Sequence, residues 1–145
     1  MIAVDTNILV YVHREDSPWH APASKKLAEL AESGRPWAIP WPSIHEFVAI
    51  VTHPRIFRPP TPLADAILQV ECWLECPSLI LLGEELDYWA VLKETMIAGK
   101  VAGPLVHDAH LAALCRLHGI TKLWTADRDF GRFAGLPVVN PLVSR

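Results

Sequence analysis

The amino-acid sequence predicts an α/β fold with a mainly parallel central sheet flanked by helices. Short apolar segments of strand length alternate with helical segments along the whole chain, a pattern typical of parallel sheets. Acidic residues follow several of the strand segments, and sites in open α/β sheets form beyond the carboxyl ends of strands. The 145 residues match one domain in size, so we expect a single domain over residues 1–145.

The first half of the chain contains five predicted elements. In order they are a buried strand over 1–5, helices over 6–15 and 17–34, a strand over 36–40 and a helix over 42–53. The second helix has a start signal at Ser17-Pro18 and a glycine stop. Pro54 ends the third helix, because proline disfavours helical backbone in the residue before it.

The second half of the chain continues the alternation after a proline-rich loop over 55–62. Its predicted elements are helices over 63–75, 84–99 and 103–119 and strands over 78–82, 120–126 and 136–140. In the first of these helices, four apolar residues share one face at helical spacing: Leu63, Ile67, Val70 and Leu74. Glycines close the other two helices, and the last of them also has a proline near its start.

The composition excludes several classes of protein. Apolar residues make up 51% of the chain, which indicates a globular protein. No apolar run is long enough for a bilayer and the N-terminus has no basic signal-peptide start, so we expect a cytoplasmic protein without a membrane partner. The odd count of three cysteines favours reduced thiols, with Cys72 and Cys76 in the core. The net charge of −3 means that binding to nucleic acid requires local basic patches or cations.

Five acidic residues fall at predicted strand exits or helix starts. Asp5 ends the first strand, and Glu46 lies in the first turn of the helix over 42–53. Asp108 lies near the start of the helix over 103–119. Asp127 and Asp129 follow the strand over 120–126. If the strands are parallel neighbours, the first four of these carboxylates converge on one edge of the sheet.

Each acid taken singly also has a purely structural explanation. Ser43 and Glu46 have the spacing of a capping box, and Asp5 and Asp127 can each cap a following helix. Asp108 can favour the positive end of its helix. Together, however, clustered carboxylates repel one another and raise one another's pKa, so an ionised cluster needs a cation. Ligands that are all oxygen favour Mg²⁺ or Mn²⁺ over zinc.

Four stretches of the chain carry a resemblance to a known family. The stretches "AVDTNILVY", "SIHEFVAI", "LVHDAHLAAL" and "LWTADRDF", in this order and spacing, resemble the motifs of PIN-domain nucleases, in particular the VapC-like toxins of type II toxin–antitoxin pairs. The resemblance implies a PIN-like three-layer sandwich and a metal-dependent endoribonuclease. By position, its acidic site residues are Asp5, Glu46, Asp108 and Asp127. Asn7 and Thr125 match supporting polar positions, and Asp129 matches the second acid of the last motif.

The resemblance also implies partners and a division of roles. The implied partners are an RNA substrate, a cognate antitoxin whose C-terminal segment covers the site, and a second copy of the chain in a homodimer. Hydrolysis of a phosphodiester needs an activated water and relief of negative charge, and one or two Mg²⁺ or Mn²⁺ ions supply both. We expect Asp5 and Asp108 as the most direct metal ligands, with Glu46 and Asp127 completing the site or orienting water.

Other polar and aromatic residues admit two interpretations each. Arg55, Arg58, Arg128 and Arg132 either contact RNA phosphates or form a solvated surface. His107 beside Asp108 either touches substrate or is a partly exposed helix residue. Trp19 and Trp41 are candidates for exposure at an interface. The histidines and cysteines form no quartet with zinc-ligand spacing, so zinc is disfavoured.

Two rival classes of protein fit the sequence less well. Haloacid dehalogenase-like phosphatases also carry an Asp after the first strand, but they place a second Asp two residues later, where this chain has Asn7. A receiver domain requires a lysine after a late strand, where this chain has the acids of "TADRDF". A non-catalytic RNA- or protein-binding module, in which the acids only cap helices, remains the alternative to a nuclease.

Overall fold

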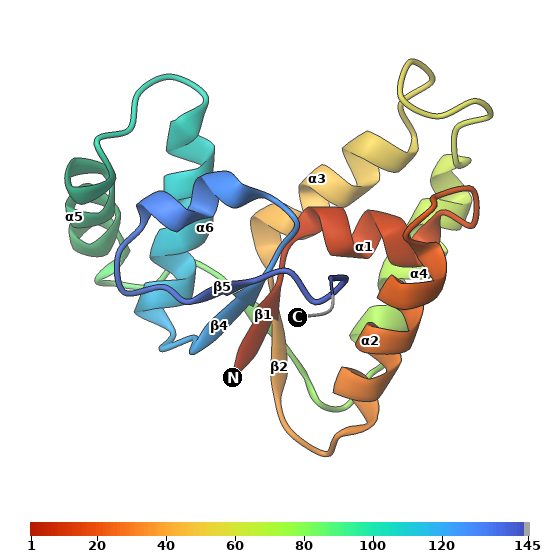
Figure 1. Ribbon diagram of the computed structural model, residues 1–145, viewed down its shortest axis with the longest axis horizontal. Helices are drawn as coiled ribbons and strands as arrows, with labels where there is room; N and C mark the ends of the chain where they lie inside the picture. Colours follow the sequence, from red (N-terminus) through yellow and green to blue (C-terminus); the bar gives the residue numbers. More distant parts are fainter. Residues whose placement is uncertain (144–145) are drawn as a thin grey trace.

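A single five-stranded parallel sheet organises the computed structural model, which describes residues 1–143 (Figure 1). The strand order is β3-β2-β1-β4-β5, and all four pairings are parallel. The strands are β1 (Ile2–Val4), β2 (Trp37–Pro40), β3 (Leu79–Leu82), β4 (Lys122–Trp124) and β5 (Val138–Val139). The predicted α/β fold with a mainly parallel sheet is therefore confirmed.

Each predicted helix is present, with ends that differ by a few residues. The helices are α1 (Thr6–His13), α2 (His20–Glu32), α3 (Trp41–Val51), α4 (Leu63–Leu74), α5 (Tyr88–Gly99) and α6 (Leu105–Leu117). A 3₁₀ turn, η1 (Arg128–Arg132), follows β4. The start of α2 was predicted too early, because the Ser17 hydroxyl accepts a 3.1 Å hydrogen bond from the Trp19 amide and forms a turn ahead of the helix. Within residues 1–143, none of these helices has the length and apolarity needed to cross a membrane.

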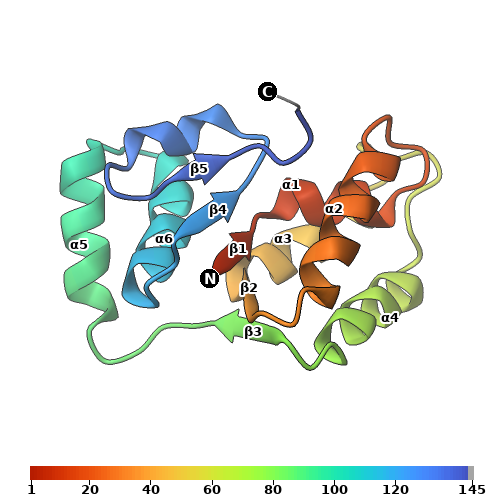
Figure 2. The ribbon, with the colours of Figure 1, turned by 60° about the horizontal axis from the view of Figure 1, so that its bottom comes forward.

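The two faces of the sheet are covered by different helices, which gives three layers (Figure 2). Side chains alternate across the strands, so Ala3 faces one core and Val4 the other. The first core holds α6 and the segment after β4 against small residues such as Ala38, and α6 itself contributes Ala109 and Ala112. The second core packs α1 to α4 against larger side chains. The small residues let α6 approach the sheet closely.

The α4 helix is present, but it is turned differently from the predicted apolar face. Three of the four residues on that face are exposed, Leu63, Ile67 and Leu74. The helix instead buries Ala66 and Trp73 against the second core. Cys72 is exposed as well, so its prediction as a core residue was wrong. Helical period alone identified the helix without indicating which side faces the core.

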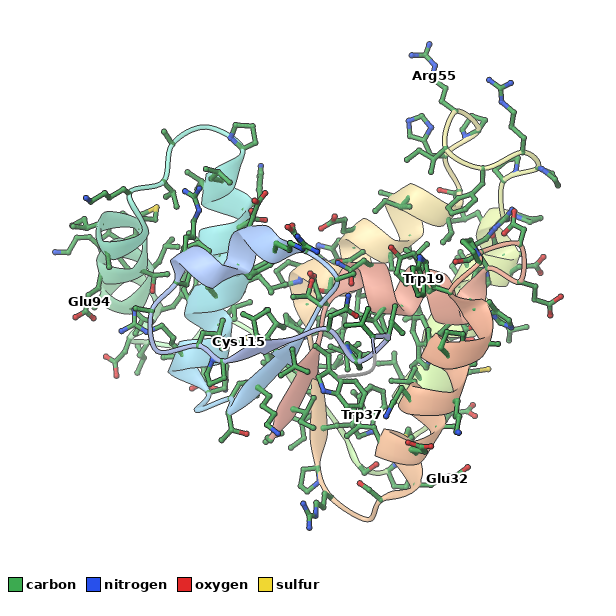
Figure 3. The ribbon with its side chains drawn as sticks, in the orientation of Figure 1. Trp19, Glu32, Trp37, Arg55, Glu94 and Cys115 are labelled. Atoms are coloured by element: carbon green, nitrogen blue, oxygen red, sulfur yellow. The ribbon has the colours of Figure 1, made fainter. Side chains whose placement is uncertain are left out.

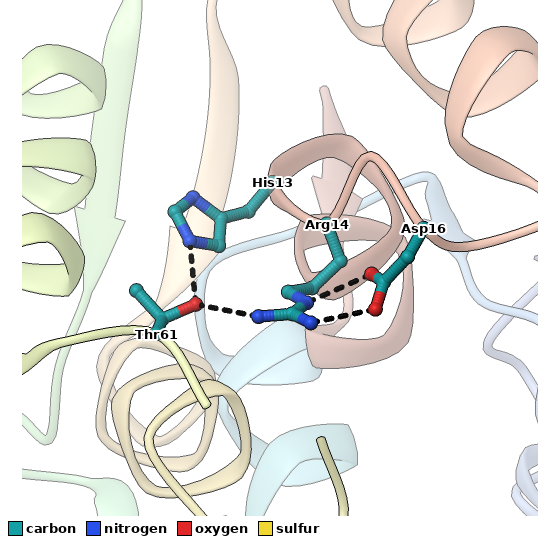
Figure 4. A network of polar contacts seen from close by, with 4 residues as sticks. All are labelled: His13, Arg14, Asp16 and Thr61. Carbon is teal, nitrogen blue, oxygen red and sulfur yellow. Dashed lines mark hydrogen bonds and ion pairs between the residues drawn. The ribbon is translucent and has the colours of Figure 1, made fainter. Parts of the chain in front are cut away.

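A polar network ties the loop between α3 and α4 to the end of α1 (Figure 4). The Thr61 hydroxyl lies 3.1 Å from Nε2 of His13 and accepts a 3.2 Å hydrogen bond from Arg14. The Arg14 guanidinium also donates to both carboxylate oxygens of Asp16, at 2.9 and 2.6 Å. The guanidinium carbon of Arg14, Cζ, lies 4.3 Å from the centre of the Phe57 ring. The loop that follows α3 is thus held at one point next to the first helix.

Candidate active site

A cavity of about 700 Å³ lies at the carboxyl edge of the sheet, and we call it the edge cavity. Its lining includes all four acids predicted for the site, Asp5, Glu46, Asp108 and Asp127. Asp5 follows β1 and Asp127 comes shortly after β4, while Glu46 and Asp108 come from the early turns of α3 and α6. Because the strands are parallel, these exits meet at one edge. The structure therefore brings the four predicted acids together.

Asp5 is the most enclosed of these acids, with 6% of its surface exposed. Its Oδ1 accepts a 2.7 Å hydrogen bond from the Thr6 amide, and its Oδ2 accepts a 2.7 Å bond from the Thr125 hydroxyl. Burial raises the pKa of Asp5 to about 6, and the charges of Glu46 and Asp127 act in the same direction. The two short hydrogen bonds oppose this shift. A cation near Asp5 would favour its ionised form.

Asn7 and Thr125, predicted as supporting polar residues, join the exits of β1 and β4. The side-chain amide of Asn7 donates a 2.9 Å hydrogen bond to the Thr125 hydroxyl oxygen, which also accepts a 3.0 Å bond from the Asp127 amide. In return, the Ala126 amide donates to Oδ1 of Asn7 at 3.1 Å. This network fixes the backbone that carries Asp127 relative to the one that carries Asp5.

Glu46 lies in the second turn of α3 and not in the first, because the helix begins at Trp41. The capping box considered for Ser43 and Glu46 does not form, since α3 has no side-chain cap. The buried Ser43 hydroxyl has no hydrogen-bond partner among the described residues. Oε2 of Glu46 instead accepts a 3.4 Å bond from the Thr6 hydroxyl, within the lining of the edge cavity. Helix capping therefore does not account for Glu46.

Among residues 1–143, three carboxylates form a group that could hold a metal ion: Asp108, Asp127 and Asp129 each offer an oxygen within 4.8 Å of the others. Burial raises the pKa of Asp108, and the charges of Asp127, Asp129 and Glu46 raise it further. Asp127 also accepts a 2.8 Å bond from the Asp129 amide, so it caps η1 as well as lining the cavity. Clustered, partly exposed carboxylate oxygens are a donor set that suits Mg²⁺ or Mn²⁺.

This group of three acids differs from the pair, Asp5 and Asp108, that the sequence analysis expected to be the most direct metal ligands. Asp129 joins the close trio, whereas both oxygens of Asp5 already accept hydrogen bonds from the protein. Each carboxylate oxygen can accept more than one bond, so Asp5 can still face a cation. The assignment of direct ligands among these acids stays a prediction.

Residues that the sequence analysis did not assign to the site also line the edge cavity, among them Trp41, His45, Glu84 and His110. Glu84 comes two residues after β3, and the strand-exit signal that located the other acids applies to it as well. His107 lines the cavity and is exposed, so its two interpretations are compatible. Trp41 has 39% of its surface exposed, as expected for an interface residue.

The arginines proposed as RNA contacts do not line the edge cavity. Arg55 lies on the loop after α3 and points away from the sheet (Figure 3), and Arg58 belongs to the same exposed loop. Arg128 and Arg132 are exposed on η1, directly after Asp127. The Arg132 charge favours the ionised form of Asp108, which places it near the acids. Contact between RNA and any of the four remains a prediction.

The fold and the edge cavity define an α/β protein with a carboxylate-lined, cation-compatible site at the exits of parallel strands. The family model of the PIN domain matches residues 2–136. Ribonuclease VapC48 of Mycobacterium tuberculosis is 35% identical over 139 residues, which cover 94% of each chain. Ribonuclease VapC43 of the same organism is 34% identical over 142 residues, covering 98% of this chain and 96% of the relative. The chain belongs to the PIN-domain family, among its VapC-like members.

Solved structures show the same fold at lower identity. VapBC2 from Rickettsia felis, bound to a promoter DNA fragment, contains a chain that matches with a TM-score of 0.71 and 17% identity, covering 96% of this chain and 98% of that one. VapC20 of M. tuberculosis, a toxin that cleaves the sarcin–ricin loop, matches with a TM-score of 0.68 and 18% identity, covering 94% and 96%. These similarities confirm the predicted PIN-like three-layer architecture.

Proposed function

We propose that this chain is an Mg²⁺- or Mn²⁺-dependent endoribonuclease and the toxin of a type II toxin–antitoxin pair. The observation that carries the proposal is the convergence of Asp5, Glu46, Asp108 and Asp127 on the edge cavity. Membership in the PIN-domain family and full-length similarity to proteins named VapC ribonucleases support it. We further propose that residues 1–145 act as one domain in the cytoplasm.

The acids in and beside the edge cavity have distinct roles in this proposal. Asp108, Asp127 and Asp129 offer the closest set of oxygens for a divalent cation. Such an ion, when bound, lowers the pKa of a bound water and neutralises charge on the phosphodiester. Asp5 adds a carboxylate whose direction Thr125 and Thr6 fix. Glu46, on the α3 side, can accept a proton or orient the attacking water.

The proposed partners follow from the relatives. Several of the structural neighbours are complexes of VapBC or FitAB type, some with DNA, which supports a cognate antitoxin for this chain. We propose that the antitoxin's C-terminal segment covers the edge cavity and that two copies of the chain associate. Light scattering on the purified chain without antitoxin tests the second point, and a mass equal to one chain would remove the homodimer.

Cleavage of RNA by the purified chain tests the proposed function. Reactions contain Mg²⁺, Mn²⁺ or a chelator, and the wild type is compared with Asp5→Asn, Asp127→Asn and the control Asp65→Asn, an exposed acid on α4. We expect metal-dependent cleavage that the control retains and the first two variants lose. Absence of both cleavage and Mn²⁺ binding would favour the non-catalytic module. Full activity of Asp5→Asn would remove that residue from the site.

A further inference from the structure

The edge cavity is much larger than a metal site requires. A divalent ion with up to six waters, at about 30 Å³ per water, occupies roughly 200 Å³. The cavity measures about 700 Å³. The remaining space lies within the range of pockets that hold small organic groups. We call the part lined by Trp41, His45, Glu84 and His110 the aromatic end, because three of these four residues carry aromatic rings.

The two ends of the cavity are separated along the edge of the sheet. Asp127 follows β4, Trp41 follows β2 and Glu84 follows β3, in a sheet ordered β3-β2-β1-β4-β5. From β4 to β3 there are three strand spacings of about 4.8 Å, or roughly 14 Å. A nucleotide whose phosphate lies at the acids can therefore extend its base toward the β2 and β3 exits.

Trp41 offers a flat apolar surface at the aromatic end. It is 39% exposed although it lines a cavity. The ring lies against the β3 exit, where a Cβ atom built on Gly83 would be 3.5 Å from Cδ1 of Trp41. The His45 ring lies 6.3 Å from it at a tilt of 45°. Exposed aromatic rings of this kind bind unpaired bases by stacking.

Glu84 follows Gly83, the residue near the Trp41 ring, and is a hydrogen-bond acceptor in the lining of the same cavity. Nε2 of His110 donates a 2.8 Å hydrogen bond to Oε1 of Glu84, and the Tyr88 ring packs edge-on against His110 at 5.6 Å. Two hydrogen bonds to the carboxylate hold the pKa of Glu84 below its usual range. The larger effect comes from the backbone of Glu84 itself and the smaller one from His110. An ionised carboxylate accepts hydrogen bonds and donates none. The Glu84 side chain is 52% exposed, so a ligand can reach its carboxylate.

The charge pattern of the cavity indicates what Glu84 faces. Among the described residues that line the edge cavity, none is lysine or arginine. Glu84 repels phosphate, so a nucleic acid bound here turns a base, and not its backbone, toward this carboxylate. Guanine presents two adjacent donors, N1–H and N2–H₂, on its Watson–Crick edge. Cytosine and adenine present one amino group each, and uracil presents one N–H between two carbonyl acceptors.

We propose that Trp41 and Glu84 form a base-binding subsite for an unpaired guanine near the cut phosphodiester. The base stacks on the Trp41 ring while its amino edge bonds to the Glu84 carboxylate. The inference rests on the proposed ribonuclease function and adds its base preference. The acidic end then binds the phosphodiester through a cation, and the aromatic end selects which phosphodiester is cut.

Cleavage-site mapping tests this subsite on the full chain. A pool of random single-stranded RNA is cut with Mg²⁺ or Mn²⁺, and the new ends are sequenced for wild type, Glu84→Gln and Trp41→Ala. The matched controls are Glu85→Gln and Trp89→Ala, both exposed and both outside the cavity lining. Trp41→Phe keeps an aromatic ring, and thermal melting checks that each variant is folded.

We expect guanine enrichment at one fixed position beside the wild-type cut, lost in Glu84→Gln and kept in Glu85→Gln. Trp41→Ala should lower kcat/KM by between about fivefold and about 150-fold, the range for loss of one stacked base. Unchanged profiles and rates in both variants would overturn the subsite while the ribonuclease stands. Unchanged cleavage with weaker antitoxin binding would also overturn it, and would assign the aromatic end to protein. A wild type that neither cuts RNA nor binds Mn²⁺ would remove both the ribonuclease and its subsite.

Discussion

The hydroxyl of Thr125 donates a 2.7 Å hydrogen bond to Oδ2 of Asp5, although the two residues are 120 positions apart in the chain. The contact follows from the sheet register, in which Val4 of β1 pairs with Trp124 of β4. Asp5 and Thr125 are therefore the next residues beyond a matched pair of parallel strands. The direction of the Asp5 carboxylate depends on this neighbouring strand as well as on its own.

Replacing Thr125 by valine should weaken both the fold and the site. The hydroxyl donates to Asp5 and accepts from Asn7 and the Asp127 amide, so Thr125→Val leaves buried polar groups without partners. We expect a loss of about 1–3 kcal/mol in the free energy of unfolding, measured by urea titration, together with reduced RNA cleavage. Thr125→Ser keeps the hydroxyl and should retain most of both. Equal behaviour of the two variants would contradict this role.

Metal binding should stabilise the protein through the close trio of carboxylates. A ligand that binds only the folded state adds about 2.7 kcal/mol at a concentration of 100 times its Kd. We expect Mn²⁺ to raise the Tm of the wild type and a chelator to reverse the effect. Asp127→Asn replaces one of the three close carboxylates by a neutral amide and should weaken Mn²⁺ affinity by more than the roughly 10–100-fold typical of outer-shell changes. If Mn²⁺ raised the Tm of Asp127→Asn as much as it raised the Tm of the control Asp65→Asn, the result would argue against metal binding at this position.

The metal-free protein should become more stable as the pH falls from 7.5 to 5. Burial raises the pKa of Asp5 from 3.8 to about 6, so the folded state binds this proton more tightly than the unfolded state does. The ionised carboxylate destabilises the fold by roughly 3 kcal/mol at pH 7.5, and about half of this is recovered by pH 5. Urea unfolding in chelator at both pH values measures the gain. Asp5→Asn should lack this part of the pH dependence, and identical pH slopes would exclude Asp5 as its source.

Much of the fold could be predicted because each element carries a local signal. The strand over 36–40 lies between a glycine stop and the proline of the next helix, and the structure has it at Trp37–Pro40. The rotation of α4 could not be predicted in this way. Its exposed face, with Leu63 and Ile67, is as apolar as its buried one, so the period fits either orientation. Contacts with the rest of the chain, through Ala66 and Trp73, decide which side is buried.

The candidate site was only partly predictable for a related reason. Asp5 and Asp127 could be found in the sequence because they lie at the ends of the predicted strands over 1–5 and 120–126, although β4 itself ends at Trp124. Glu84 follows β3 by the same rule, but it resembled the first residue of the helix over 84–99, which in fact begins at Tyr88. The hydrogen bond between Glu84 and His110 joins segments 26 residues apart, and no sequence spacing indicates it.

Gly99, the last residue of α5, should tolerate no side chain. A Cβ atom at this position would lie 2.7 Å from Cε1 of Phe133, a buried ring in the core beside α6. Gly99→Ala gains helix propensity but forces this ring to move, and overpacking of a core typically costs about 1–3 kcal/mol. Movement of the Phe133 ring should also shift Phe130, because the two rings lie close together and Phe130 lines the edge cavity. We therefore expect a lower free energy of unfolding and weaker Mn²⁺ binding. Gly131→Ala, with open space around the added carbon, should change neither, and equal effects of the two substitutions would remove the packing explanation.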